Sequence, residues 1–148
     1  MSFIPNLDPM DYLSSDPAVK AKFIQDLGDT FSNIGFACVV NHFTPDEEIK
    51  KFYGSVEDFF KLPLEAKVKY EIPDLGGQRG YTSFGREHAK GSDAPDLKEF
   101  WQIGQEVEGE YVSKEHYPDN VQVTELADFN RQSMVLYRGF EKSGSILL

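Results

Sequence analysis

An α+β fold is the fold class that the sequence predicts, on two kinds of observation. Two segments, 17–34 and 45–61, carry apolar residues at helical spacing and begin at a proline that follows a capping residue. Short runs at 36–40 and 97–104 carry the β-branched and aromatic residues typical of strands. With 148 residues, 40% of them hydrophobic and 14% aromatic, the chain is expected to form one domain with a buried core.

The helix over 17–34 has a start signal, a buried stripe and a stop signal. Asp16 is suited to cap its first turn, Pro17 takes the first helical position, and Gly35 falls where a terminating glycine belongs. The stripe consists of Val19, Phe23, Leu27, Phe31 and Ile34. The preceding segment, "FIPNLDPMDYL", is expected to form a short strand and a turn.

The run "FACVV", residues 36–40, predicts a buried strand, in which Cys38 would be an inert buried thiol rather than a nucleophile. Thr44 and Glu47, with a proline between them, match a capping box for the helix over 45–61. Its buried face would consist of Ile49, Phe52, Val56, Phe59 and Phe60.

The second half is expected to contain fewer regular elements. A short helix follows Pro63, and the glycine-rich stretch 72–95 indicates an extended loop. A strand over 97–104 and a turn at "YPDN" come next. A long amphipathic helix over 123–148 would bury Leu126, Phe129, Leu136 and Phe140.

Charge and composition exclude several classes of protein. The net charge of −10 argues against a nucleic-acid partner, which needs clustered Lys and Arg. A single cysteine excludes an internal disulfide. The N-terminus has neither the basic nor the apolar part of a signal peptide, and no apolar run reaches the ~20 residues of a membrane span. We therefore expect a cytoplasmic protein without a membrane partner.

The last three residues, Ile146 to Leu148, are aliphatic and need a surface to cover them. They could dock on the core of this domain. The interpretation that we favour is that the chain is the front part of a longer protein.

A search for catalytic motifs finds none. The histidines stand in "HFT", "HAK" and "HYP", so His42, His88 and His116 give no His-x-Asp or His-x-Glu pair for a non-haem iron site. Motifs for zinc hydrolases, nucleophile elbows and phosphate loops are also absent from the sequence. We expect no catalytic residue and no metal ligand in the chain, and expect Asn41 and His42 to be hydrogen-bonding residues at a strand end.

Six segments, taken together, resemble the N-terminal region of isopenicillin N synthase-like iron(II)- and 2-oxoglutarate-dependent oxygenases. "IPNLDPMDY" resembles the opening IPxID, and "GFACVVNHF" resembles GFFxVxNHG, with Phe43 in place of the glycine. "FFKLPLEAK" is similar to FFxLPxExK, "RGY" is shared, and "DLKEFWQIG" is similar to DxKExFxxG. "YPDN" stands near the position of an Asn-x-Trp-Pro turn. The resemblance spans nearly the whole chain.

The resemblance implies helices and first strands of a double-stranded β-helix, or jelly roll, with the barrel incomplete in this chain. It also implies that residues 1–148 are a non-haem dioxygenase N-terminal domain and that the iron ligands and the 2-oxoglutarate-binding arginine lie in a later half. Fe(II) and 2-oxoglutarate are then implied for a complete member, and neither is expected to bind this chain alone. The expected partners are a C-terminal catalytic half, in the same or a separate chain, and a small-molecule substrate.

The resemblance places the RGY loop near the substrate pocket, which makes Arg79, Tyr81 and Arg86 candidate substrate-binding residues. Arg79 could pair with a substrate carboxylate, or could be a surface arginine paired with a nearby acid. Tyr81 could contact substrate through its ring and hydroxyl, or could pack in the core. Lys98 and Glu99 are expected to form a structural ion pair, and Trp101 to be a core residue.

The function implied is the N-terminal part of an oxygenase that hydroxylates or desaturates a small molecule, inactive by itself. Two alternatives stay open: a non-catalytic interaction module derived from an oxygenase, and one half of a split enzyme. Free strand edges and the apolar "SILL" end would supply the contact surface of such a module.

Overall fold

A computed structural model describes residues 4–86, 90–91, 94–107, 109, 113 and 115–148. These residues form two compact units. The terminal unit comprises residues 1–47 and 138–148, and the central unit comprises residues 48–137. Within the described part of the chain, no helix is both long enough and apolar enough to cross a membrane.

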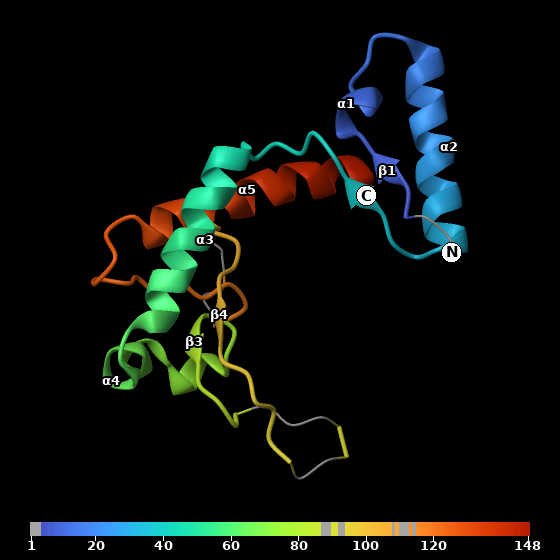
Figure 1. Ribbon diagram of the computed structural model, residues 1–148. Coiled ribbons are helices and arrows are strands. Elements are labelled where there is room, and N and C mark those ends of the chain that lie inside the picture. Colours follow the sequence, from blue (N-terminus) through green and yellow to red (C-terminus); the bar gives the residue numbers. More distant parts are fainter. Residues whose placement is uncertain (1–3, 87–89, 92–93, 108, 110–112, 114) are drawn as a thin grey trace. The chain divides into compact units, whose positions relative to one another are not determined.

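The terminal unit begins as the sequence predicts, with a strand and a well-capped helix (Figure 1). Strand β1 (Asn6–Leu7) pairs in parallel with β2 (Cys38–Val39). Helix α2 (Pro17–Asn33) starts where expected, because the Asp16 carboxylate accepts a hydrogen bond from the Ala18 backbone N–H at 2.8 Å. A four-residue helix, α1 (Pro9–Tyr12), takes the place of the predicted turn.

Several expectations for this unit are wrong. Phe31 and Phe140, which the apolar stripes of their helices predicted to be buried, are 50% and 57% exposed. Cys38 is exposed rather than buried, and Phe36 beside it is 69% exposed, because β2 is a two-residue strand that pairs with β1 on one side. Thr44 does not cap the next helix: among the described residues its hydroxyl oxygen has no hydrogen-bond partner. The Thr44 side chain instead packs on Gly139, where that oxygen occupies the space that a Cβ atom would need. Burial against a distant glycine has displaced the local cap.

The central unit holds most of α3 (Asp46–Lys61) and the first part of α5 (Phe129–Leu147). Helix α4 (Leu64–Lys67) follows Pro63 as predicted, and continues into the 3₁₀ turn η1 (Val68–Tyr70). The stretch expected to be a loop contains a second 3₁₀ turn, η2 (Pro73–Leu75), and strand β3 (Gly80–Thr82). Strand β3 pairs antiparallel with β4 (Phe100–Gln102), which lies within the predicted strand.

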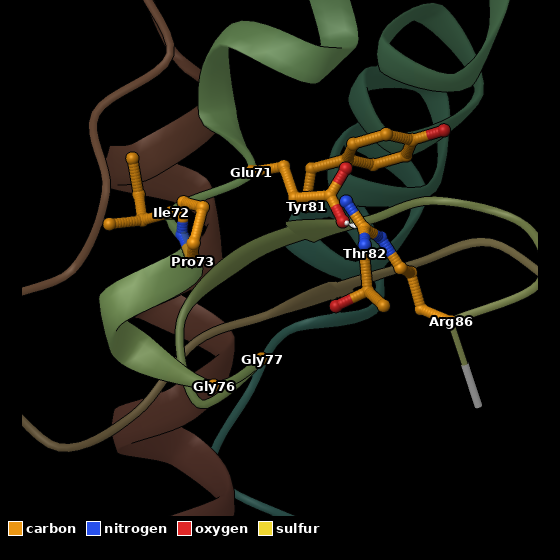
Figure 2. A pocket seen from close by; sticks show the side chains of 8 residues that line it. All are labelled: Glu71, Ile72, Pro73, Gly76, Gly77, Tyr81, Thr82 and Arg86. Carbon is orange, nitrogen blue, oxygen red and sulfur yellow. Dashed lines mark hydrogen bonds and ion pairs between the residues drawn. The ribbon is translucent and has the colours of Figure 1, made fainter.

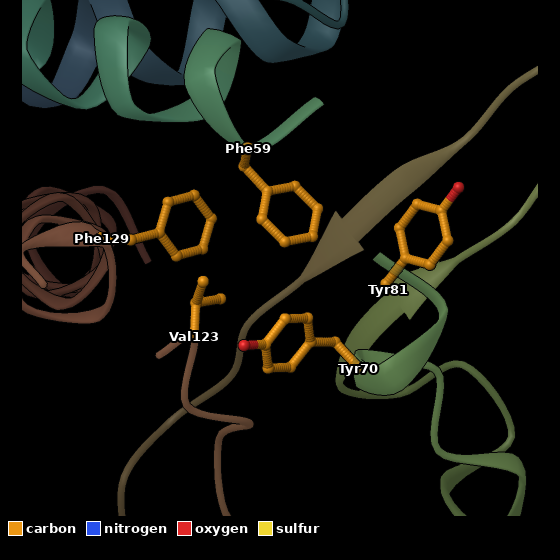
Figure 3. Close-up of a cluster of buried hydrophobic side chains, with 5 residues drawn as sticks. All are labelled: Phe59, Tyr70, Tyr81, Val123 and Phe129. Atoms are coloured by element: carbon orange, nitrogen blue, oxygen red, sulfur yellow. The ribbon is translucent and has the colours of Figure 1, made fainter. Parts of the chain in front are cut away.

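An aromatic cluster is the core of the central unit, and its side chains point toward one another from separate elements (Figure 3). Phe59 of α3 is 0% exposed and stacks on Phe129 of α5, with ring centroids 5.3 Å apart. Trp101 packs edge-on against Phe59 at 4.8 Å, as a core residue should. The buried members are Phe59, Tyr70, Tyr81, Val123 and Phe129.

Helix α5 begins at Phe129, six residues later than the pattern of apolar residues predicts. The Asn130 side chain accepts a hydrogen bond from the Val123 backbone N–H at 2.7 Å and donates one to the Val121 carbonyl at 2.6 Å. These bonds hold residues 121–123 in a non-helical path, since they satisfy backbone groups that a helix would otherwise pair.

Gly80 adopts φ +81° at the start of β3, and a Cβ atom there would collide with the Tyr70 carbonyl oxygen. We expect Gly80→Ala to lower the free energy of unfolding by at least about 2 kcal/mol, because backbone strain and a backbone clash add. Gly54 is the matched control, since a Cβ there meets no atom within 4 Å. Gly54→Ala should stabilise its helix by about 0.5–1 kcal/mol. Urea unfolding of both variants measures the difference, and equal effects would contradict the expectation.

Candidate functional site

A pocket of about 310 Å³ opens beside β3 in the central unit (Figure 2). Its wall comes from the segment after η1, from η2 and the glycines that follow, from β3 and from the loop after β3. The lining residues are Glu71, Ile72, Pro73, Gly76, Gly77, Tyr81, Thr82 and Arg86. Two of the three predicted candidates, Tyr81 and Arg86, therefore lie at one pocket.

Arg86 and Glu71 form an ion pair at this pocket, drawn as a dashed contact in Figure 2. The Arg86 Nε–H group donates to Glu71 Oε1 at 2.7 Å, and the Ser83 hydroxyl donates to Glu71 Oε2 at 2.9 Å. Both carboxylate oxygens of Glu71 are thus engaged. Arg86 uses one of its five N–H groups in this pair, which leaves the terminal guanidinium nitrogens available as far as the described residues are concerned.

Thr82 supplies a hydroxyl group without a partner. The residue is 7% exposed, and among the described residues its Oγ1 atom has no hydrogen-bond partner. The same atom would lie 3.5 Å from a Cβ atom at Gly77, across the pocket wall. An unsatisfied buried hydroxyl costs stability of about 1–3 kcal/mol, so its presence in a pocket wall points to a ligand or solvent partner.

Tyr81 lines the pocket, and its hydroxyl group belongs to a buried network of charged side chains. The side chain is 1% exposed, and its hydroxyl donates to Glu99 Oε2 at 2.5 Å. Glu99 also accepts two hydrogen bonds from the Lys67 ammonium group, at 2.7 and 3.0 Å. Lys67 donates in addition to the Phe60 carbonyl at 3.2 Å. This network, which we call the Lys67–Glu99–Tyr81 network, joins α4, β3 and the segment leading into β4.

Burial and hydrogen bonding set the ionisation of this network. Burial, then the hydrogen bond and negative charge of Glu99, raise the pKa of Tyr81 well above its ordinary value, so its phenol stays protonated and donates. Burial by itself raises the pKa of Glu99, but hydrogen bonds from Lys67 and Tyr81 and the charge of Lys67 outweigh it, so the pKa lies below its usual value. Glu99 is therefore a carboxylate at neutral pH.

Arg79, the third candidate, does not line the pocket. Its guanidinium group occupies the space that a Cβ atom at Gly104 would need, so the side chain packs directly on that glycine. Its Nη1 group donates to the Gln78 carbonyl at 2.7 Å. The structure therefore separates Arg79 from Tyr81 and Arg86.

The histidines are placed as hydrogen-bonding residues where the structure describes them. His42 Nδ1 accepts a hydrogen bond from the Thr44 backbone N–H at 3.4 Å, and His116 Nδ1 lies 3.0 Å from the Ser113 hydroxyl. His88 lies outside the described residues. Within the described part of the chain, no group of three or more His, Cys, Asp or Glu side chains is placed to hold a metal ion.

Lys98 and Glu99 do not form the ion pair predicted from the sequence, and the Lys67–Glu99–Tyr81 network was not predicted. Glu99 pairs with Lys67, and Lys98 lies 3.2 Å from Asp96. Both residues come just before β4, and each has a different partner: the Glu99 carboxylate turns to the buried Lys67 ammonium group, while the Lys98 side chain is 52% exposed beside Asp96. A signal was present: Lys67, Tyr81 and Glu99 are the Lys, Tyr and Glu of three quoted segments, "FFKLPLEAK", "RGY" and "DLKEFWQIG". Three motifs far apart in the sequence meet in one network.

The class of protein follows from a family profile that matches most of the chain. Residues 4–125 match the family described as "non-haem dioxygenase in morphine synthesis N-terminal", and the chain belongs to that family. This match confirms the resemblance drawn from the six segments.

Two relatives of the chain are a 2-oxoglutarate-dependent dioxygenase and a proline hydroxylase. The chain is 34% identical over 113 residues to the 2-oxoglutarate-dependent dioxygenase frbA of Dothideomycetidae sp. (strain 11243), a match that covers 68% of this chain and 34% of that protein. It is 34% identical over 106 residues to the proline hydroxylase buaE of Petromyces alliaceus, with 68% and 33% covered. The chain thus spans about a third of the length of these relatives.

Solved structures show the same fold. A 2OG-Fe(II) oxygenase family protein from Caulobacter crescentus superposes with a TM-score of 0.81 at 33% identity, over 99% of this chain and 47% of that chain. A full-length protein from Neurospora crassa, solved in complex with alpha-KG, superposes with a TM-score of 0.74 at 23% identity, over 97% and 44%. The second likeness shows the fold alone.

Proposed function

We propose that residues 1–148 are the N-terminal domain of an iron(II)/2-oxoglutarate-dependent oxygenase that hydroxylates or desaturates a small molecule. The observation that carries the proposal is the likeness to the Caulobacter protein, which extends over 99% of this chain but only 47% of that one. The other half of such an enzyme, in the same or a separate chain, is the proposed partner. It would complete the jelly roll that β3 and β4 begin, and it would hold the iron and 2-oxoglutarate.

The described residues suit a supporting role in this reaction. Iron with 2-oxoglutarate supplies the oxidising chemistry in this family, while protein groups bind the substrate, orient it and exclude water. The aromatic cluster and the Lys67–Glu99–Tyr81 network hold β3 rigidly against α3 and α4. The pocket beside β3 is then a preformed wall, with Tyr81 and Arg86 as the proposed substrate-binding residues and Arg79 as a residue that buttresses β4.

Succinate formation from 2-oxoglutarate tests the proposal. We expect the purified 148-residue chain with Fe(II) and 2-oxoglutarate to form no succinate, because its described residues offer no metal triad. A chimera that joins this chain to the remaining part of the Caulobacter protein should bind Fe(II) and form succinate. Succinate formed by the chain alone would contradict the proposal that the iron and 2-oxoglutarate sites lie in the other half. A chimera that folds but binds no Fe(II) would contradict the proposal that this chain is the N-terminal domain of such an oxygenase.

A non-catalytic interaction module is the second candidate, favoured by one observation. Both sheets of the described residues have only two strands, and apart from the Glu71–Gly80 bridge on β3 no further strand pairs with their outer edges in that part of the chain. Sedimentation of the purified chain separates the candidates. A stable monomer favours the module, whereas self-association through these edges favours a domain made to join a catalytic half, and copurification with a second polypeptide favours a split enzyme.

A further inference from the structure

We propose that the pocket beside β3 recognises a carboxylate on the small-molecule substrate, with Arg86 and Thr82 as the recognising groups and Ile72 and Pro73 as the apolar wall. The inference deepens the proposed function and rests on it in one respect, that the ligand is the substrate.

Arg86 is the charged anchor of the proposed site. Glu71 accepts a hydrogen bond from its Nε–H group at 2.7 Å, which favours one orientation of this partly exposed side chain. With respect to the described residues, the two terminal nitrogens stay free to donate a parallel pair of hydrogen bonds, the geometry that matches a carboxylate. The arginine of the pocket is therefore oriented before a ligand arrives, so less entropy is lost on binding.

The Thr82 hydroxyl is the second group of the site that is open to a ligand. Its hydroxyl is buried in the pocket wall without a partner among the described residues, whereas the neighbouring hydroxyl of Tyr81 is committed to Glu99. A ligand oxygen would satisfy Thr82 and remove the cost of an unpaired buried hydroxyl. Gly77 adopts φ +79° opposite this hydroxyl and has no side chain to fill the space.

Charge decides between an acidic and a basic ligand. Glu71 is the pocket's carboxylate, but both its oxygens already accept hydrogen bonds, from Arg86 and Ser83. The negative charge of Glu71 is already balanced by Arg86, so a cationic ligand gains little there, whereas an anionic ligand finds the terminal nitrogens of Arg86 open with respect to the described residues. The side chains of Ile72 and Pro73 add an apolar surface, so the favoured ligand carries a carboxylate on an apolar body.

Three probes of the same size test the charge preference: benzoate, benzamide and benzylamine. Each is titrated into the 148-residue chain, and the amide NMR signals of Gly77 and Thr82 report binding at the pocket. We expect benzoate to bind about tenfold more tightly than benzamide, since a charged acceptor strengthens the hydrogen bonds of Arg86. Equal affinities, or tighter binding of benzylamine, would overturn the proposal.

Two substitutions and one matched control assign the preference to residues. Arg86→Gln should remove the advantage of benzoate over benzamide. Arg131→Gln should leave it unchanged, because Arg131 is paired with Asp128 through Nε in the same way, at 3.0 Å, and is 57% exposed against 62% for Arg86, but lies outside the pocket. Thr82→Val keeps the shape of the side chain and should weaken benzoate about threefold. An unchanged preference in Arg86→Gln would overturn the proposal.

2-Oxoglutarate is the probe that separates substrate from cosubstrate. It carries carboxylates but no apolar body, so we expect it to shift the Gly77 and Thr82 signals less than benzoate does at equal concentration. Tighter binding of 2-oxoglutarate would overturn the assignment to a substrate. None of these titrations uses iron or measures succinate, so failure of the pocket and failure of the proposed function give separate results.

Discussion

Phe59→Ala is expected to cost about 3–5 kcal/mol in the free energy of unfolding. Phe59 is 0% exposed, and its ring contacts aromatic rings from other parts of the central unit and from its own helix. Truncation would leave a cavity that rigid rings on several elements cannot collapse to fill. Urea unfolding followed by tryptophan fluorescence measures the loss, because the Trp101 ring centroid lies 4.8 Å from that of the deleted ring.

Tyr53→Ala is the control for this prediction. Tyr53 lies on the same helix, α3, but is 70% exposed. Removing its ring should change the free energy of unfolding by about 0.5 kcal/mol or less. If the two substitutions cost the same, the aromatic cluster would not be the centre of stability of the central unit.

Lys67→Met is expected to have the second largest effect. The substitution keeps an unbranched side chain of similar length but removes the cation that pairs with the Glu99 carboxylate. Both side chains of the pair are largely buried, with Lys67 9% and Glu99 16% exposed. Removing one partner of a buried ion pair costs about 3–5 kcal/mol in the free energy of unfolding. We expect a loss toward the lower end of this range, because Glu99 keeps its hydrogen bond from Tyr81. Urea unfolding at neutral pH measures the loss.

A double substitution tests the physical reason. Lys67→Met with Glu99→Leu removes both charges, so it should recover much of the stability lost in Lys67→Met. A double variant as unstable as the sum of the single variants would show that the loss comes from packing and not from an uncompensated carboxylate.

The same pair predicts how stability depends on pH. The folded-state pKa of Glu99 is below its ordinary value of about 4.5, so its stabilising contribution is complete above that value and is lost as pH falls through the folded pKa. Between about pH 7 and pH 3 the urea midpoint should therefore fall more steeply in the original chain than in Glu99→Gln. Glu57→Gln is the control, because Glu57 pairs with Lys61 at the surface and is 68% exposed. A pH dependence unaffected by Glu99→Gln would contradict the assignment.

The local elements and the family could be predicted from the sequence because their causes are local. Asp16 and Pro17 start α2 through a cap within two residues, and Pro63 starts α4. Periodicity placed Phe59 and Phe129 on buried faces, where the structure has them. The six segments resembled the family through residue order alone, and the profile match over residues 4–125 confirmed it.

Tertiary structure decided what depends on contacts between distant residues. Thr44 belongs to a sequence pattern typical of a helix cap, but its side chain packs on Gly139 instead of capping the helix. Asn130 delays the start of α5, because its side chain forms hydrogen bonds with the backbone of residues 121 and 123. The candidate arginines could not be told apart in sequence; folding packs Arg79 on Gly104 and turns Arg86 to the pocket. Lys67 and Glu99 are 32 residues apart, and no spacing rule links them, because a loop closure and a strand pairing bring them together.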